Sequence, residues 1–152
     1  MTDVFAGLSV SRETTAALGA YLDLVARWTP KINLVSRGSV PDLNSRHLID
    51  SAQLFSHLRP TAASWADLGS GGGFPGIVVA ILAREMRPDL RLTLIESDRR
   101  KATFLRVVVA ELRLSADVRA ARIEDVPPLL ADVVSARALA PLDALLGLAE
   151  RH

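Results

Sequence analysis

Cysteine is absent from this chain, aromatic residues are few, and lysine is almost missing. The lack of cysteine excludes disulfide bonds, thiolate catalysis and cysteine-ligated metal sites, and we expect no metal site of another kind. Aromatic residues make up only 5 % of the chain, which argues against extensive stacking of nucleic-acid bases. Lys31 and Lys101 are the only lysines, so arginine carries most of the positive charge. Arginine suits bidentate contacts with phosphate and carboxylate, although a GC-rich genome gives the same bias.

Long apolar stretches are also missing, because charged residues interrupt every hydrophobic run. The pattern predicts no transmembrane helix, and the first residues lack the basic start and apolar core of a signal peptide. We therefore expect a soluble, cytoplasmic protein that does not associate with membranes. Its 152 residues, of which 49 % are hydrophobic, suit one compact domain, and the net charge of +1 identifies no partner.

The chain divides near residue 60 into two parts with different patterns. In residues 1–59 apolar residues recur at helical spacing, and we predict an N-terminal helical extension. Ser11 is placed to cap the first helix, and we expect that helix to end before Pro30, because the residue before a proline avoids helical backbone angles. A second helix is predicted to begin near Pro41, after an extended turn.

In residues 60–152 short β-like segments alternate with helical ones. The strands are expected at 64–68, 90–95, 118–120 and 131–136, and the helices at 75–84, 99–112 and 142–150. This alternation predicts an α/β fold, with a parallel sheet and right-handed crossovers. Ligands of such sheets lie beyond the C-terminal ends of the strands. Asp67, Glu96 and Ser135 all lie at predicted strand ends, so we expect them to share one site.

A glycine-rich loop follows the first of these strands, and two kinds of ligand fit its spacing. Residues 71–76 satisfy the G-x-G-x-x-G pattern of dinucleotide-binding proteins, with Glu96 placed to bind a ribose. Residues 67–73 satisfy the acid-x-G-x-G-x-G pattern of Rossmann-like methyltransferases, which bind S-adenosyl-L-methionine. The second interpretation also uses Asp67 and Gly69, which the first leaves without a role. A tight turn that binds no ligand is the remaining alternative.

Blocks of sequence spread in order over nearly the whole chain carry a family resemblance. They lie at residues 28–36, 46–51, 67–76, 94–97, 101–105, 122–124 and 135–138. Asn33-Leu34 together with Arg46-His47-x-x-Asp50-Ser51 is the most specific part of the pattern. The chain resembles the bacterial small-subunit (16S) rRNA guanine-N7 methyltransferases, also called the glucose-inhibited division protein B family. The resemblance implies a Rossmann-like enzyme that uses S-adenosyl-L-methionine to methylate N7 of a guanine in small-subunit ribosomal RNA.

The resemblance also implies roles for individual residues. It implies contacts of Gly69 and Phe74 with the cofactor, an adenine-side pair at Ile123 and Glu124, and an arginine, Arg137, beside the cofactor. Together with residues from the loop pattern, the candidate cofactor site is Asp67, Gly69, Gly71, Phe74, Glu96, Ile123, Glu124 and Arg137. Taken alone, Ile123 also suits core packing, and Arg137 in its apolar setting also suits a structural ion pair.

Guanine N7 has an exposed lone pair, so its methylation requires positioning more than acid–base catalysis. We therefore predict no catalytic triad, and Arg122 and Arg137 are the only candidate catalytic residues. Arg37, Arg46 and Arg122 are candidates for RNA contacts, although Arg122 also suits a solvated surface position. His47 is interpreted as part of a structural block with its neighbours rather than as a general base.

Members of this family continue beyond the position that His152 occupies, with a further strand, a lysine-glycine segment and a terminal antiparallel pair. The resemblance implies that this chain is a C-terminally truncated form, in which the third, second, first and fourth strands lie side by side and the fourth has an exposed edge. We expect self-association through this edge, weak cofactor binding and little methylation. The alternatives are an NAD-dependent oxidoreductase and a catalytically impaired fragment that binds the cofactor or RNA.

Overall fold

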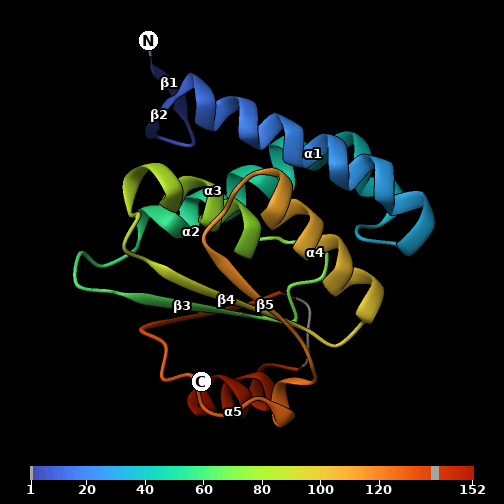
Figure 1. Ribbon diagram of the computed structural model, residues 1–152, viewed down its shortest axis with the longest axis vertical. Helices are drawn as coiled ribbons and strands as arrows, with labels where there is room; N and C mark the ends of the chain where they lie inside the picture. The colour runs from blue at the N-terminus through green and yellow to red at the C-terminus, as the bar shows by residue number, and fades with distance from the viewer. Residues whose placement is uncertain (1, 138–140) are drawn as a thin grey trace.

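A small parallel sheet with helices on both faces forms the centre of the protein (Figure 1). The computed structural model describes residues 2–137 and 141–152. The strands are β3 (Ser64–Leu68), β4 (Arg91–Glu96), β5 (Ala116–Ala120) and β6 (Val133–Ala136). They lie in the order β5-β4-β3-β6 and every neighbouring pair is parallel, which confirms the predicted α/β class and strand order.

The helices form two layers of unequal size. Helices α1 to α4 cover one face of the sheet and α5 lies on the other (Figure 1). Their bounds are Arg12–Ile32 for α1, Ile49–Ser56 for α2, Gly76–Met86 for α3, Arg99–Glu111 for α4 and Leu142–Arg151 for α5. Each predicted strand and helix of the second half is present, with bounds that differ by at most a few residues. None of the helices in the described ranges combines the length and apolar character needed to cross a membrane.

The predicted end of the first helix before Pro30 is wrong, because α1 continues through this residue to Ile32. Proline lacks a backbone N–H, which removes one hydrogen bond from the last turns of the helix but leaves the later ones in place. The helix ends instead at Asn33, which has a left-handed φ of 50° and donates its backbone N–H to the carbonyl oxygen of Thr29 at 2.9 Å. The start is as predicted, since the Ser11 hydroxyl caps the helix by accepting the N–H of Thr14.

Two other features of the N-terminal part differ from the sequence-based expectation. An antiparallel hairpin, β1 (Thr2–Phe5) and β2 (Leu8–Ser11), precedes α1. Pro41 does not begin a helix but lies inside a 3₁₀ segment, Arg37–Asp42, which leads through a π-helical turn, Leu43–Leu48, into α2. The chain is therefore helical from Arg37 to Ser56, first as a 3₁₀ helix, then as a π-helix and then as an α-helix.

One hydrophobic cluster joins the N-terminal helices to the sheet. It contains Tyr21 from α1, Phe55 from α2 and Leu94 from β4, together with α3. Every residue of α3 from Gly76 to Ala83 is buried, because this helix lies between the sheet and the N-terminal helices. The N-terminal part thus packs on the α/β core and encloses its first crossover helix. The division near residue 60 remains a prediction about domains.

Candidate functional site

The glycine-rich loop between β3 and α3 takes a backbone path that only glycine accepts easily. Gly69, Gly71 and Gly73 have φ values of 66°, 55° and 98°, in the left-handed region that other residues avoid. A Cβ atom on Gly73 would lie 2.6 Å from Cγ1 of Ile77. The Tyr21 hydroxyl donates a hydrogen bond of 2.7 Å to the carbonyl oxygen of Gly72, so α1 supports the loop from behind.

Glu96, at the end of β4, holds the same loop from the opposite side. Its Oε2 accepts the backbone N–H of Gly71 at 2.6 Å, and its Oε1 accepts the N–H of Asp98 at 2.9 Å. A further hydrogen bond of 2.9 Å runs from the N–H of Ser70 to the carbonyl oxygen of Ile95. The Glu96 side chain is nearly buried, so these contacts place a fixed negative charge at the C-terminal end of the sheet.

Asp67, the acid at the end of β3, lies beneath the loop and lines none of the three cavities described below. Its Oδ1 accepts a hydrogen bond of 2.7 Å from the Ser135 hydroxyl, and the Trp65 indole N–H in turn donates to Ser135 Oγ at 2.7 Å. Its Oδ2 has no hydrogen-bond partner among the described residues. Burial raises the pKa of Asp67 to about 6, against the lowering effect of the Ser135 hydrogen bond. The ends of β3, β4 and β6 lie side by side, as expected. The Asp67 carboxylate is buried against Ser135, however, whereas the Glu96 carboxylate lines the larger cavity.

A cavity of about 540 Å³ lies beyond the ends of β4 and β5. Six of the residues predicted for the cofactor line it: Gly69, Gly71, Glu96, Ile123, Glu124 and Arg137. Ile123 is buried in a short 3₁₀ segment, Ile123–Asp125, so its apolar side chain is both part of the core and part of the wall. Arg122 and Lys101 add positive charge to the rim. The arrangement combines an apolar wall, a carboxylate and a glycine backbone, which suits a nucleoside.

A second cavity, of about 230 Å³, adjoins the first and shares Leu34, Gly69, Gly71 and Arg137 with it. Phe74 lines this smaller cavity, with its ring centroid 5.2 Å from that of Tyr21 and 5.3 Å from that of His47. Phe74 is therefore separated from Glu96 and Ile123, although all three were predicted for one site.

Sequence reasoning did not include His47 and Leu34 in the site. Both lie in sequence blocks that carry the family resemblance, and that position was the available signal. Burial lowers the pKa of His47, and the positive charges of Arg137 and Arg46 add to this effect. The opposing charge of Asp50 only partly compensates, so the imidazole is neutral at neutral pH.

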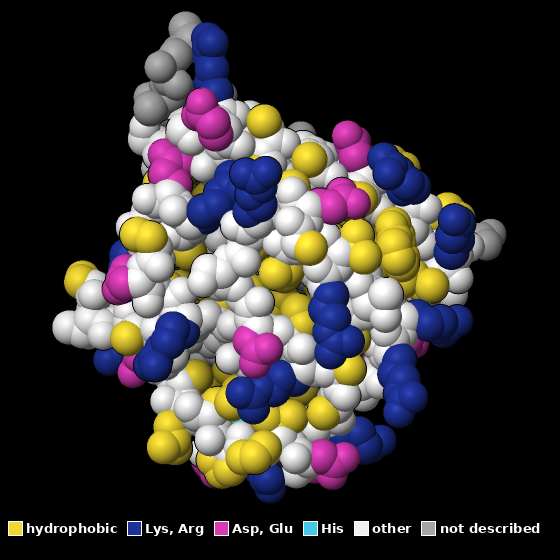
Figure 2. All heavy atoms as spheres, viewed as in Figure 1, with side chains coloured by type: hydrophobic (Ala, Val, Ile, Leu, Met, Phe, Trp, Pro, Cys, Tyr) yellow, Lys and Arg dark blue, Asp and Glu magenta, His cyan; other side chains and the backbone are white. Residues whose placement is uncertain are grey.

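Of the three arginines predicted to contact RNA, only Arg122 is among the described residues that line the two cavities at the glycine loop. Arg46 is exposed beside His47, and Arg122 is exposed with an ion pair of 3.6 Å to Glu124. The side chain of Arg37 lies outside the described part of the structure. Arg137 is exposed where the two cavities meet, immediately after β6. Lysines and arginines elsewhere on the face in Figure 2 are spread among acidic side chains rather than gathered in one patch.

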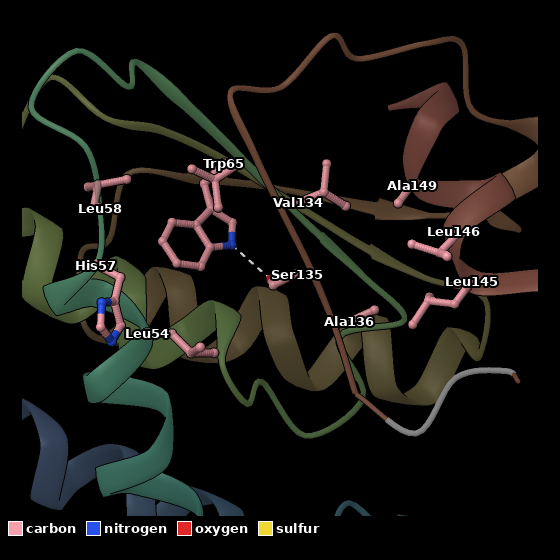
Figure 3. A pocket seen from close by; sticks show the side chains of 11 residues that line it. Leu54, His57, Leu58, Trp65, Val134, Ser135, Ala136, Leu145, Leu146 and Ala149 are labelled. Carbon is pink, nitrogen blue, oxygen red and sulfur yellow. Dashed lines mark hydrogen bonds between the residues drawn. The ribbon is translucent and has the colours of Figure 1, made fainter. Parts of the chain in front are cut away.

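A third cavity, of about 470 Å³, runs along β6 at the edge of the sheet (Figure 3). Leu54 and Leu58 lie at one side of this edge groove, Leu145 and Leu146 lie at the other, and Trp65 forms part of its floor. Its lining is mostly apolar, and β6 pairs only with β3 among the described strands. The groove is distinct from the cavities at the glycine loop, but Trp65 and Ser135 belong both to the groove and to the hydrogen-bonded chain that ends at Asp67.

Known proteins resemble this chain over most of its length. The profile of the family described as rRNA small subunit methyltransferase G (GidB) matches residues 14–151. A curated protein from Cereibacter sphaeroides, described as ribosomal RNA small subunit methyltransferase G, is 54 % identical over 98 % of this chain and 72 % of its own length. A protein of the same description from a Ruegeria species is 54 % identical over 95 % of this chain and 70 % of its own length.

Among solved structures, the plantazolicin methyltransferase BpumL in complex with SAH is similar at a TM-score of 0.48 and 13 % identity. The similar region covers 93 % of this chain and 56 % of that chain.

Proposed function

Since this chain belongs to the rRNA small subunit methyltransferase G family, we propose that it methylates N7 of a guanine in small-subunit ribosomal RNA, with S-adenosyl-L-methionine as the methyl donor. The observation that carries this proposal is the larger cavity at the C-terminal end of the sheet. There the Glu96 carboxylate and the backbone of Gly69 and Gly71 face a common space of about 540 Å³.

The residues around this cavity fit the proposed cofactor. Pockets for small molecules usually measure about 300–1,000 Å³ and combine apolar walls with a few fixed polar groups. Each Glu96 oxygen accepts one backbone N–H and keeps a second lone pair, which suits the two hydroxyls of a ribose. Ile123 offers an apolar surface for a planar base, and the glycines allow close approach to the loop backbone. Asp67 takes no direct part in this proposal, because its carboxylate lies beneath the loop.

The chain's residues are proposed to act by positioning. When bound, the cofactor supplies an electrophilic methyl group on a sulfonium. No proton must leave guanine N7 before it attacks, so the required task is to hold two groups in line and exclude water. Arg137, where the two cavities meet, is proposed to orient the reactants, and Arg37, Arg46 and Arg122 are proposed to contact the RNA. The reaction would take place in the cytoplasm, where ribosomal subunits are assembled.

Titration calorimetry with S-adenosylhomocysteine and with NAD tests the cofactor. We expect the first to bind in the larger cavity and the second to show no saturable heat. Incorporation of labelled methyl groups into small-subunit particles tests the activity. Binding of NAD in preference to S-adenosylhomocysteine would favour an oxidoreductase. Binding of S-adenosylhomocysteine without methyl transfer would favour a protein that only binds the cofactor or RNA.

We also propose that two copies of this chain associate through the edge groove. One edge of β6 has no partner among the described strands, and this edge, together with apolar side chains that include Leu146, supports the proposal. An open strand edge presents unpaired backbone groups that favour pairing with another strand.

A further inference from the structure

The smaller cavity is the part of the site that the proposed cofactor leaves unexplained. Its volume of about 230 Å³ is below the usual lower limit of roughly 300 Å³ for a drug-sized ligand, but it has room for a single planar base. It shares Gly69, Gly71 and Arg137 with the larger cavity, so a base within it would lie next to a cofactor in the larger one. Enzymes that modify a nucleobase commonly take it out of its stack into such a pocket.

Phe74 and His47 form one wall of this cavity, and Tyr21 packs against Phe74 outside the cavity lining. Phe74 packs against Tyr21 and His47 with interplanar angles of 48° and 40°. Tyr21 is fixed by its hydrogen bond to Gly72, so the position of the glycine loop also fixes the position of this wall. Tilted aromatic contacts of this kind restrict the orientation of each ring.

His47 lines this cavity and has one ring nitrogen without a hydrogen-bond partner among the described residues. This atom, Nε2, is buried. Buried polar atoms nearly always have a partner, so an exception calls for a ligand or another explanation. Because burial and the neighbouring Arg46 and Arg137 keep the ring neutral, His47 adds no charge beside a base that becomes cationic on methylation.

We propose that the smaller cavity receives the target base, an inference that rests on the proposed function. His47 is then a positioning residue, whose Nε2 forms a hydrogen bond with the edge of this base. A neutral imidazole offers one donor and one acceptor, and the guanine edge offers both kinds of partner. Because Nε2 is closed off from solvent, the ring must turn when the base enters. A His47 ring that only packs against Phe74 would not move when the base binds, so this movement distinguishes a positioning role from a packing role.

Two variants of His47 distinguish hydrogen bonding from packing. His47→Phe keeps a ring against Phe74 but removes both nitrogens, whereas His47→Gln loses the ring but keeps a donor and an acceptor. The full chain is saturated with S-adenosylhomocysteine and titrated with guanosine monophosphate, with adenosine monophosphate as the comparison. We expect His47→Phe to weaken guanosine monophosphate binding at least fivefold and to leave S-adenosylhomocysteine affinity within twofold. We expect His47→Gln to bind both ligands within twofold of the unmodified chain.

His57→Phe is the matched control, because this histidine is exposed at the end of α2 and lines the edge groove rather than either cavity at the glycine loop. It should leave both affinities unchanged. In ¹⁵N spectra of the imidazole groups, the His47 Nε2 resonance should move when guanosine monophosphate is added, and the His57 resonances should not.

Several results would overturn the inference and leave the proposed function intact. These are a chain that binds S-adenosylhomocysteine but not guanosine monophosphate, a His47→Phe variant that binds guanosine monophosphate normally, or a variant that loses S-adenosylhomocysteine instead. The last result would place the cofactor, not the base, against His47. If the unmodified chain does not bind S-adenosylhomocysteine at all, the proposed function fails and the inference fails with it.

Discussion

Glu96 has two roles: it holds the glycine loop by hydrogen bonds, and it lines the larger cavity next to that loop. Its two carboxylate oxygens accept backbone N–H groups from Gly71 and Asp98, which follow different strands. A hydrogen bond to a charged acceptor is about twice as strong as one between neutral groups. The side chain therefore sets the shape of the loop before any ligand arrives, and the same oxygens face the cavity.

Replacing Glu96 by glutamine tests this double role. Gln keeps one carbonyl oxygen but places an amide NH₂ opposite one of the two backbone N–H donors. We expect S-adenosylhomocysteine binding to weaken by roughly tenfold to a hundredfold, which corresponds to about 1.5–3 kcal/mol for a lost charge-assisted hydrogen bond. Calorimetry measures the change, with Glu111→Gln on the exposed end of α4 as the control. Equal affinities for the two variants would contradict a role for Glu96.

Asp67 gives the stability of the protein a pH dependence. Because burial raises its pKa from 3.8 to about 6 in the folded state, the folded protein holds a proton there that the unfolded chain has lost. The stabilisation is complete below about pH 4 and disappears as the pH rises through 6. At roughly 1.4 kcal/mol per pKa unit, its size is at most about 3 kcal/mol.

Asp67→Asn keeps the acceptor for the Ser135 hydroxyl and removes the titration. Urea unfolding of both proteins between pH 4 and pH 7 measures the effect. We expect the unmodified protein to lose stability relative to the variant as the pH rises. A difference that does not vary with pH would show that the carboxyl titrates normally.

At the scale of elements, Gly76 lets the first turn of α3 lie close against the sheet. A Cβ atom on this residue would lie 2.5 Å from Oδ2 of Asp67 and 2.5 Å from Cδ2 of Leu94. The first turn of α3 therefore lies directly against β3 and β4, and this fixes the direction in which the loop opens. A glycine at this position is a packing requirement, since its φ is outside the left-handed region.

Gly76→Ala should push α3 away from the sheet. Overpacking of this kind costs about 1–3 kcal/mol, and we expect a loss of unfolding free energy of that size together with weaker S-adenosylhomocysteine binding. Gly19→Ala is the matched control, because Gly19 lies on the exposed side of α1 and a Cβ there would meet no atom within 4 Å. Alanine there should raise stability by about 0.5–1 kcal/mol. Urea denaturation measures the unfolding free energy of both variants. Equal changes in the two variants would contradict the packing argument.

The order of strands and helices follows from the sequence because alternation and periodicity are local properties. The direction of a side chain, by contrast, depends on how the elements pack together in three dimensions. Asp67 and Glu96 both end strands, yet one lies beneath the loop and the other faces the cavity, which depends on the close approach of Gly76. Pro30 gave a wrong helix end because the packing of α1 outweighs one lost hydrogen bond. His47 lines the smaller cavity and contacts Phe74, which is distant along the chain, and spacing in the sequence does not indicate such a contact.

At the scale of the whole molecule, the two faces of the sheet differ in how well they are covered. Helices α1 to α4 share a large buried cluster with one face. Helix α5 has no buried residue, and Leu142 and Leu146 are 71 % and 55 % exposed. Apolar side chains gather accordingly over the lower end of the molecule in Figure 2, where α5 lies. Together with the edge of β6 that no other described strand covers, this less covered side is the basis of the proposed association.

Leu146→Glu should weaken the proposed association by placing a charge in the edge groove. We expect the dimer dissociation constant to rise at least tenfold, or about 1.4 kcal/mol, in sedimentation equilibrium. Leu130→Glu is the control, because Leu130 is 84 % exposed and does not line the groove. An unmodified chain that stays monomeric at all concentrations, or equal effects of the two variants, would contradict association through this groove.

The hydrogen bond between Tyr21 and Gly72 has a consequence for the order in which the site forms during translation. Helix α1 leaves the ribosome before the glycine loop, so the support behind the loop is available when the loop is made. Ser135 is made much later, and Asp67 gains its hydrogen bond only when β6 joins the sheet. The nascent site is therefore braced first by the N-terminal helix and is completed last by the strand at the sheet's edge.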